Sequence, residues 1–421
     1  MIGRSLDDWL QWQESLNAGE INLGLDRIAK VANRLDLQQP AGSVFVVAGT
    51  NGKGSCVWLL EQLLQTSGAR IGAYTSPHLL KYNERIRIDG APVDDRCLVR
   101  AFERIESASD GQALTYFEYG TLAALWIFSN ASCDAWILEV GLGGRLDAVN
   151  IVEPDYSLLT TIALDHQKWL GNDVEQIARE KAGIMRLGTP AFFGDYPAPE
   201  AIGETAKELG APLFCLGEAF DYSLEDAVWN WRGQKYELKS LPWPPGRGEE
   251  QIRNLSLVLA VLERYDPTLL ARRHLICELA EQFHLPGRFQ VFNGDRQWVL
   301  DVAHNAQAAG NLNTKLEALG SVPRTIAIVG MMADKQAADF AVGLSGQVDQ
   351  WITCTIDAAR GRDGSDLARC LRAVGLGPVR STDTPESACQ LAYESTPPGT
   401  RILVCGSFYV VGPALDWLGL Y

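Results

Sequence analysis

The sequence predicts an α/β fold with two domains. The length of 421 residues exceeds what one ordinary core can bury, so a second domain is expected. Apolar runs of strand length alternate with helical segments, which is typical of parallel strands buried on both faces. Leu285-Pro286-Gly287 interrupts this alternation, and we therefore expect domains at 1–285 and 286–421.

In the first domain the alternation of strand and helix begins near residue 44. Strands are expected where apolar residues run together, and helices where they recur with helical spacing. The expected elements are helices at 6–16, 57–64, 121–128 and 174–182, and strands at 44–48, 70–74, 135–140 and 157–162. Their order implies a mainly parallel sheet.

The middle of the chain follows a different pattern. Residues 220–238 show a hairpin pattern, and the proline-rich stretch 241–246 is predicted as a loop because it can continue neither strand nor helix. A helix is expected again at 254–264. Beyond the boundary at 285–287 the alternation restarts, with a helix at 306–319 and strands at 298–302, 325–329, 351–355 and 401–404. The second domain is therefore expected to be a smaller, Rossmann-like α/β unit.

Composition narrows the class of protein. The 37 basic and 52 acidic side chains give a net charge of −15, which disfavours general binding to nucleic acid or anionic membranes. No apolar run is long enough to span a bilayer, and residues 1–8 lack the features of a secretory signal. Nine singly placed cysteines are expected to be core hydrophobes in a reducing cytoplasm.

A glycine-rich loop lies between the strand at 44–48 and the following helix. Glycines let several backbone N–H groups point at one anion, the helix N-terminus adds positive potential, and Lys53 adds a full charge. A glycine-rich turn with an exposed lysine is the alternative, and the coincidence of strand, loop, lysine and helix disfavours it. We expect ATP phosphates to be bound by Gly49, Thr50, Asn51, Gly52, Lys53, Gly54 and Ser55.

The spacing of this loop departs from the common Gly-x-x-x-x-Gly-Lys-[Ser/Thr] pattern. That pattern would place its first glycine at Val47, and Gly54 stands where the usual hydroxyl would be. The shortened spacing favours an amide-forming ligase over a kinase or GTPase. A metal-binding hydroxyl is then expected from Ser76 as well as, or instead of, the loop.

Three polar side chains follow or end predicted strands and could hold Mg²⁺. They are Ser76 after 70–74, Glu139 in 135–140, and His166 after 157–162. Ligands collect at the carboxyl ends of strands in open α/β sheets, and Mg²⁺ takes oxygen ligands, which makes the histidine the unusual member. Taken alone, each residue is better explained as a capping serine, a solvated glutamate or a satisfied histidine, but together with the loop they favour a metal site.

Several motifs resemble the folylpolyglutamate synthases, over nearly the whole chain. Their relatives, the Mur peptidoglycan ligases, share the Gly-Thr-Asn-Gly-Lys opening of the loop. Segments 22–27 and 115–120 resemble the bacterial bifunctional form, which is also a dihydrofolate synthase. The other matching motifs are Tyr74-Thr75-Ser76-Pro77-His78-Leu79, Asn83-Glu84-Arg85-Ile86, residues 139–147, Glu180-Lys181-Ala182-Gly183-Ile184, Pro286-Gly287-Arg288-Phe289 and Asp301-Val302-Ala303-His304-Asn305.

The resemblance implies a role for individual residues. Two Mg²⁺ ions would be held by Ser76, Glu139, His166 and a carbamate on Lys181, although the residues alone favour an ordinary helix lysine there. Lys53, Lys181 and His166 would be catalytic. ATP would also contact Asn254, Arg288 and Asp301, with His304 close by. The dihydropteroate pocket would be lined by Asn22, Leu23, Gly24, Thr115, Tyr116, Phe117, Glu118, Leu146, Asp147 and Ala148.

Two details weaken parts of this assignment. Core packing explains the aromatic residues Tyr116 and Phe117 as well as stacking on a pterin does. Ala306 stands where the family usually has proline after Asn305, which leaves the stiffness of that turn in question.

The implied activity is ATP-dependent ligation of L-glutamate to dihydropteroate and to reduced folates through an acyl phosphate. The partners would be small molecules only, and the protein a cytoplasmic monomer. One alternative is a monofunctional folylpolyglutamate synthase. A Mur-type amino-acid ligase is another, but its usual N-terminal domain would not fit before residue 49. A kinase or nucleotide-gated regulator, using the same loop, is the third.

Overall fold

The computed structural model describes residues 3–16 and 23–421, which form two compact units. The N-terminal unit comprises Met1–Ala163, Leu170–Trp243 and Glu249–Gln282, and the C-terminal unit comprises Leu164–Trp169, Pro244–Gly248 and Phe283–Tyr421. Each unit has its own sheet. The predicted α/β class with mainly parallel sheets is confirmed.

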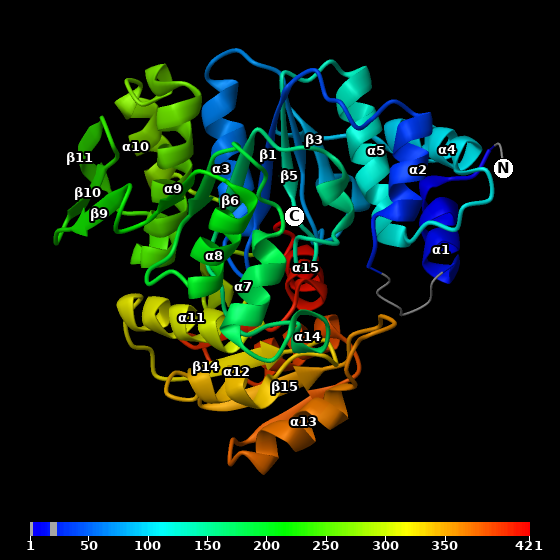
Figure 1. Cartoon of the computed structure of the whole chain (residues 1–421). Helices are drawn as coiled ribbons and strands as arrows, with labels where there is room; N and C mark the ends of the chain where they lie inside the picture. Colours follow the sequence, from blue (N-terminus) through cyan, green and yellow to red (C-terminus); the bar gives the residue numbers. More distant parts are fainter. Residues whose placement is uncertain (1–2, 17–22) are drawn as a thin grey trace. The chain divides into compact units, whose positions relative to one another are not determined.

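An eight-stranded sheet forms the centre of the N-terminal unit, in the order β4-β3-β2-β5-β1-β6-β7-β8 (Figure 1). Its neighbours run parallel except for β2 with β3 and β3 with β4. The strand β1 is buried along its apolar run, as expected for a strand covered on both faces. The strands are β1 (Ser43–Ala48), β2 (Ile71–Tyr74), β3 (Ile86–Ile88), β4 (Ala91–Pro92), β5 (Ala135–Glu139), β6 (Tyr156–Leu159), β7 (Ala191–Phe193) and β8 (Leu213–Cys215).

Helices cover this sheet, and α1, α2, α4 and α5 pack together as one group (Figure 1). The helix at 6–16 and the helix at 174–182 lie where they were predicted. The other three predicted here begin several residues earlier than expected, because their first turns carry glycine or polar residues. The helices of this unit are α1 (Leu6–Leu16), α2 (Asp26–Arg34), α3 (Lys53–Gln65), α4 (Asp95–Ser109), α5 (Tyr116–Asn130), α7 (Val174–Ala182), α8 (Glu200–Leu209), α9 (Glu249–Tyr265) and α10 (Arg273–Glu281). The short helix α6 (Gln167–Leu170) belongs, except for its last residue, to the C-terminal unit.

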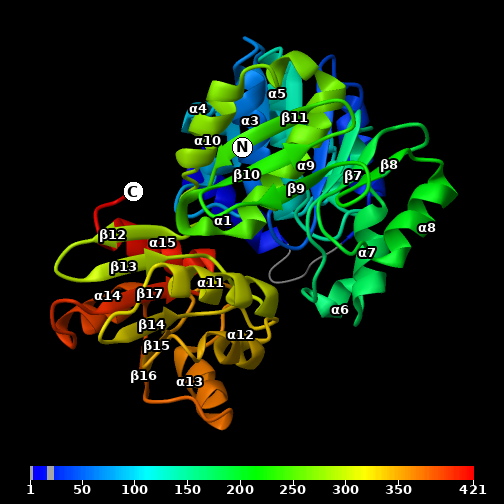
Figure 2. The same ribbon diagram turned by 90° about the vertical axis from the view of Figure 1, so that its left-hand side faces the viewer.

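The predicted hairpin is part of a three-stranded antiparallel sheet, β9 (Asp221–Leu224), β10 (Val228–Arg232) and β11 (Glu237–Pro242) (Figure 2). The prediction that 241–246 is entirely loop was wrong at its start, since β11 continues to Pro242. The strand is at the edge of its sheet, where a missing N–H is tolerated, and the Pro242 carbonyl still accepts a hydrogen bond from Trp229 Nε1 at 2.9 Å.

The C-terminal unit contains a six-stranded sheet in the order β12-β13-β17-β14-β15-β16, parallel except for β12 with β13 (Figure 2). The last strand, β17, lies between β13 and β14, so the direction of winding reverses there. Its strands are β12 (Gln290–Asn293), β13 (Gln297–Leu300), β14 (Thr325–Val329), β15 (Gln350–Cys354), β16 (Val379–Thr382) and β17 (Arg401–Cys405). Its helices are α11 (Ala306–Ala318), α12 (Ala337–Leu344), α13 (Gly364–Ala373), α14 (Pro385–Glu394) and α15 (Phe408–Trp417).

Candidate active site

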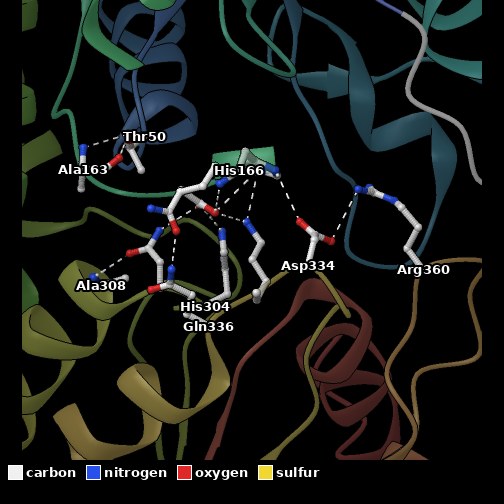
Figure 3. Close-up of polar contacts among 12 residues, drawn as sticks. Thr50, Ala163, His166, His304, Ala308, Asp334, Gln336 and Arg360 are labelled. Carbon is white, nitrogen blue, oxygen red and sulfur yellow. Dashed lines mark hydrogen bonds and ion pairs between the residues drawn. The ribbon is translucent and has the colours of Figure 1, made fainter. Parts of the chain in front are cut away.

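The glycine-rich loop connects β1 to α3, and its shape depends on glycine. Gly49 has φ +146° and Gly52 has φ +91°, which are backbone conformations that favour glycine. A Cβ atom on Gly49 would lie 1.8 Å from Thr160 Oγ1, and one on Gly52 would lie 2.4 Å from Asn254 Oδ1. Thr50 ties the loop to the segment after β6, because its hydroxyl accepts a hydrogen bond from Ala163 N at 3.0 Å (Figure 3). The loop is therefore built into the N-terminal unit.

Alanine at position 49 is expected to abolish nucleotide binding. Thr160 has little freedom to move away from the new Cβ, because its hydroxyl donates to Asn51 O at 2.6 Å. Gly68→Ala is a matched control, since Gly68 has φ +85° but open space around its Cβ position. Gly49→Ala should lose about 1–3 kcal/mol more unfolding free energy than Gly68→Ala, as expected for an overpacked site. Calorimetric ADP titration and urea unfolding test this, and equal losses in the two variants would contradict it.

Two lysines converge on one carbonyl of this loop. Lys53 Nζ lies 3.1 Å from the carbonyl oxygens of both Gly49 and Thr50. Lys181, on α7, is buried and donates from Nζ to Gly49 O at 2.7 Å. The two ammonium groups give the loop concentrated positive charge, which suits the polyanionic tail of a nucleoside triphosphate.

Ser76 and Glu139 lie together at the carboxyl edge of the sheet, as the strand-end rule predicts. The strands β2 and β5 are parallel neighbours, and Ser76 N donates to Glu139 Oε2 at 3.1 Å. The Glu139 residue is 5% exposed. A buried carboxylate beside a hydroxyl group fits a hard cation such as Mg²⁺.

Histidine, cysteine, aspartate and glutamate side chains form no cluster of three or more that could hold a metal within residues 3–16 and 23–421. A cation at Ser76 and Glu139 would therefore need other oxygen ligands. Mg²⁺ commonly takes these from phosphates and water. His166 belongs to the C-terminal unit. It was predicted to follow a strand closely, but β6 ends at Leu159, earlier than predicted, so His166 lies seven residues beyond the end of the strand.

Asp147 is a buried carboxyl group in the loop after β5. Its oxygens accept hydrogen bonds from Leu142 N at 2.8 Å and Val149 N at 3.0 Å. Burial raises the pKa of Asp147 from 3.8 to about 6, although these backbone donors and the charge of Lys181 act in the opposite direction. The folded chain consequently binds this proton more tightly than the unfolded chain does.

Asp147→Asn should therefore show a pH-dependent difference from the unmodified protein. Protonated Asp147 contributes its full stabilisation below pH 3.8, and the contribution is lost as the pH rises through about 6. The unfolding free energy of the unmodified protein, relative to the variant, should fall by on the order of 3 kcal/mol across that window. Urea unfolding at pH 4 to 8 measures this difference, and a constant difference would contradict the burial argument.

The segment predicted to line the pteroate pocket also begins a helix. Thr115 is the N-cap of α5: its hydroxyl accepts from Glu118 N at 3.2 Å, and Thr115 N donates to Glu118 Oε2 at 2.7 Å. Glu118 also pairs with Arg27 of α2 at 2.9 Å. Thr115 and Glu118 therefore have structural partners, and the Thr-x-x-Glu capping pattern could have revealed this from the sequence.

The remaining residues predicted for this pocket have varied environments. The Phe117 ring packs on Gly141, where a Cβ atom would lie 2.5 Å from its Cζ. Leu23, Gly24, Tyr116 and Leu146 are half-buried, and Ala148 is buried, whereas Asn22 lies outside the described residues.

A cluster around Arg85 was not predicted from the residues alone. The Arg85 guanidinium lies 5.2 Å from the ring centre of Tyr82 and 5.4 Å from that of Tyr116. Its Nε donates to His78 Nδ1 at 2.8 Å, and burial together with the Arg85 charge lowers the pKa of His78 to about 4. A buried cation among aromatic rings suits a flat, electron-rich ligand.

In the C-terminal unit, Asp301 directly follows β13. Its carboxylate accepts hydrogen bonds from Phe289 N at 3.0 Å and from Ala303 N at 2.8 Å, so it ties two backbone segments together. The Arg288 guanidinium lies 5.1 Å from the ring centre of Phe408. Ala306 opens α11, which is capped by the preceding Asn305, so the turn is held without proline.

Asp165 is the centre of a polar cluster in the same unit. Lys335 Nζ lies 2.6 Å from Asp165 Oδ1, Asn305 Nδ2 lies 3.1 Å from Oδ2, and His304 Nε2 lies 3.5 Å from Oδ2. Burial alone would raise the pKa of Asp165, but the His304 hydrogen bond and the Lys335 charge outweigh it and hold the pKa well below its usual range. Sequence analysis identified only His166 and His304 of this group. The position of Lys335, shortly after β14 ends, was the signal for the rest.

Comparisons with known proteins decide the family. The Mur ligase, glutamate ligase domain family matches residues 287–408. The dihydrofolate synthase/folylpolyglutamate synthase of Escherichia coli (strain K12) is 40% identical over 98% of this chain and 95% of its own length. The chain belongs to the dihydrofolate synthase/folylpolyglutamate synthase family. It is an ATP-dependent carboxylate–amine ligase, as predicted.

Other relatives and solved structures agree with this family. The dihydrofolate synthase/folylpolyglutamate synthase of Haemophilus influenzae is 35% identical over 96% of each chain. The structure of E. coli FolC in complex with DHPP and ADP has a TM-score of 0.92 and 39% identity, covering 99% of this chain and 98% of its own. A bifunctional folylpolyglutamate synthase/dihydrofolate synthase with Mn, AMPPNP and L-glutamate bound has a TM-score of 0.90 and 40% identity, with 99% and 98% covered. Among the described residues, no helix is both long and apolar enough to cross a membrane.

Proposed function

We propose that this ligase adds L-glutamate to dihydropteroate, forming dihydrofolate, and to reduced folates, forming folylpolyglutamates. Both reactions use ATP and pass through an acyl phosphate. The observation that carries the proposal is the phosphate loop with Lys53 at its Gly49 and Thr50 carbonyls, in a chain that matches the bifunctional enzymes over nearly its whole length.

The first step needs ATP because a carboxylate oxygen is a poor leaving group. A carboxylate oxygen of the pteroate or folate attacks the γ-phosphorus of ATP, and ADP leaves. The loop 49–55 and the first turn of α3 bind the phosphates, while Lys53 neutralises charge on the transferred group. Asn254, Arg288, Asp301 and His304 are the other proposed contacts to ATP.

In the second step the amine of glutamate attacks the acyl carbon, giving a tetrahedral intermediate that expels phosphate. The amine must lose a proton to form the amide, and the proposed catalytic residues besides Lys53 are Lys181 and His166. The pteroate is proposed to lie against Leu23, Gly24, the start of α5 and residues 146–148, near the Arg85 cluster. Orientation of the three reactants is the main task of the protein in this step.

Mg²⁺ is the proposed metal, with two ions per active chain. Ser76 and Glu139 would hold it, and their buried oxygen ligands fit it. When bound, Mg²⁺ would neutralise phosphate charge. His166 and a carbamate on Lys181 are the further proposed ligands. The hydrogen bond from Lys181 Nζ to Gly49 O is compatible with a carbamate, because the carbamate nitrogen keeps one N–H.

Mass spectrometry of products tests the function directly. The full chain is incubated with ATP, Mg²⁺ and glutamate, with dihydropteroate or tetrahydrofolate in separate reactions. We expect one added glutamate on dihydropteroate and one or more on tetrahydrofolate, with ADP formed only when glutamate and an acceptor are both present. A glutamylated product from tetrahydrofolate but none from dihydropteroate would indicate a monofunctional folylpolyglutamate synthase. ADP formation without glutamate would instead indicate a kinase.

We also propose that the protein acts as a cytoplasmic monomer, with a catalytic ATP-binding domain over 1–285 and a glutamate-ligase domain over 286–421. All nine cysteines are free thiols, which suits a reducing compartment. Light scattering of the purified chain tests the oligomeric state.

A further inference from the structure

The His166 ring lies between a cation and an anion in the C-terminal unit (Figure 3). Its Nε2 atom is 3.2 Å from Lys335 Nζ, and its Nδ1 atom is 3.6 Å from Asp334 Oδ2. The side chains of Lys335 and Asp334 are 7% and 12% exposed, so water screens these contacts weakly.

The charges of Lys335 and Asp334 bias which ring nitrogen carries the proton. An ammonium group can only donate, so toward Lys335 at 3.2 Å the Nε2 atom acts as the acceptor, and the Asp165 carboxylate on the same side is farther away, with its Oδ1 4.0 Å from Nε2. The carboxylate of Asp334 can only accept, and its negative charge 3.6 Å away favours a hydrogen on Nδ1 without forming a hydrogen bond to it. These contacts favour the neutral Nδ1–H tautomer of His166, with its lone pair on Nε2.

Asp334 has few other groups to satisfy its charge. Both of its oxygens are enclosed and make no hydrogen bond, and its charged neighbours among the described residues are His166 and Arg360, each 3.6 Å away. Histidines that bind metals commonly direct one N–H at a carboxylate, which fixes the ring and leaves the other nitrogen for the cation. The Asp334 carboxylate lies on the Nδ1 side of His166 at an ion-pair distance of 3.6 Å, and the Lys335 ammonium lies on the Nε2 side, where a metal cation would bind.

We propose that Asp334 is a positioning residue that orients His166 for a divalent cation, and that Lys335 occupies the place of that cation until it is displaced. The inference rests on the proposed role of His166 as a metal ligand. Displacement from His166 leaves Lys335 its shorter contact, 2.6 Å to Asp165, because an ammonium group has three donors. The exchange therefore costs one weak contact and keeps the buried ion pair.

Nitrogen-15 NMR of the histidine rings tests the tautomer in the metal-free, full-length protein. The chain has only five histidines, and the His166 signals are identified as those missing in His166→Gln. We expect protonated Nδ1 and unprotonated Nε2. A protonated Nε2 would overturn the inference, whatever the ligase assay shows.

Mn²⁺ titration of the same samples tests the exchange. Asp334→Ala should weaken Mn²⁺ binding about tenfold, as expected for loss of a group that orients a ligand. Lys335→Met should strengthen it about threefold to tenfold, since one competing hydrogen bond is removed. If Asp334 and Lys335 only stabilise the fold, both variants should change the Mn²⁺ affinity in the same direction, and that result would overturn the proposal. Lys168→Met is the matched control for the loss of a nearby positive charge, and it should change binding by less than about twofold.

The titration also separates this inference from the proposed function. If Mn²⁺ leaves the His166 signals unbroadened in every variant while the tautomer is as expected, then His166 is not a metal ligand and the exchange is overturned. The glutamate ligation measured by mass spectrometry would stand in that case. Lys335→Met removes the partner of Asp165 and could prevent folding. Asp334→Ala keeps the Asp165–Lys335 ion pair and therefore still tests the proposal. Unchanged Mn²⁺ binding in Asp334→Ala would overturn the positioning role of Asp334.

Discussion

Lys53→Ala is expected to abolish acyl-phosphate formation, with kcat lowered by at least about 10²–10³-fold, the loss seen when one charge-stabilising donor is removed. Lys53 Nζ lies against the Gly49 and Thr50 carbonyls at the start of α3, where the phosphates of ATP are proposed to bind. Alanine favours helix, so the first turn of α3 should persist and the fold should survive.

The decisive measurement is the scrambling of oxygen-18 between the bridging and non-bridging positions of ATP, in the presence of dihydropteroate and the absence of glutamate. Scrambling reports reversible transfer of the γ-phosphate, and it should disappear in Lys53→Ala. Lys207→Ala is the matched control, because Lys207 is exposed on α8 of the same unit. Unchanged ATP turnover in Lys53→Ala would refute the assignment of the loop.

Asp165→Asn is expected to destabilise the C-terminal unit by about 3–5 kcal/mol, the usual consequence of removing one partner from a buried ion pair. The side chains of Asp165 and Lys335 are each only 7% exposed, and Nζ lies 2.6 Å from Oδ1. Without the carboxylate, the Lys335 ammonium keeps the desolvation penalty and loses the charge that compensates it. The hydrogen bonds from Asn305 and His304 lose their charged acceptor as well.

Scanning calorimetry of the full chain measures this effect, since two units can unfold in separate transitions. Only the transition of the C-terminal unit should shift. The double variant Asp165→Asn, Lys335→Met should be more stable than the sum of the two single changes predicts. Arg369→Ala removes an exposed pair in the same unit, and it should change stability by less than about 1 kcal/mol. If Asp165→Asn changes the stability of the C-terminal unit no more than Arg369→Ala does, the Asp165–Lys335 pair is not effectively buried.

Local signals predicted much of the fold. The strands β1, β5 and β14 and the helices α1 and α7 follow from continuous apolar runs or helical spacing, and the structure has them within one residue of the expected bounds. Short or polar strands such as β3 and β16 escaped, because few of their residues are buried and no clear period is left in the sequence. Partners that lie far apart in the chain, such as β17 between β13 and β14, leave no local signal either.

The candidate site was predicted unevenly for the same reason. Ser76 and Glu139 could be placed together because both stand at ends of strands whose order in the sheet follows a general rule. The contact between Asp165 and Lys335 spans 170 residues, and neither side chain lies in a recognisable motif. His166 was expected directly after a strand, whereas the chain continues for several residues and packs within the other unit.

The attachment of Glu118 has a consequence for how substrate preference can evolve. This side chain holds the start of α5 and the Arg27 guanidinium at the same time. A substitution there alters the scaffold before it alters any ligand contact. Neighbouring Tyr116 is half-buried and makes neither of those attachments; its ring contacts Arg85 and Tyr82, so a change there affects the proposed pocket lining rather than the cap of α5. Adaptation to a different acceptor is therefore more accessible at Tyr116, whereas selection should keep Glu118 unchanged.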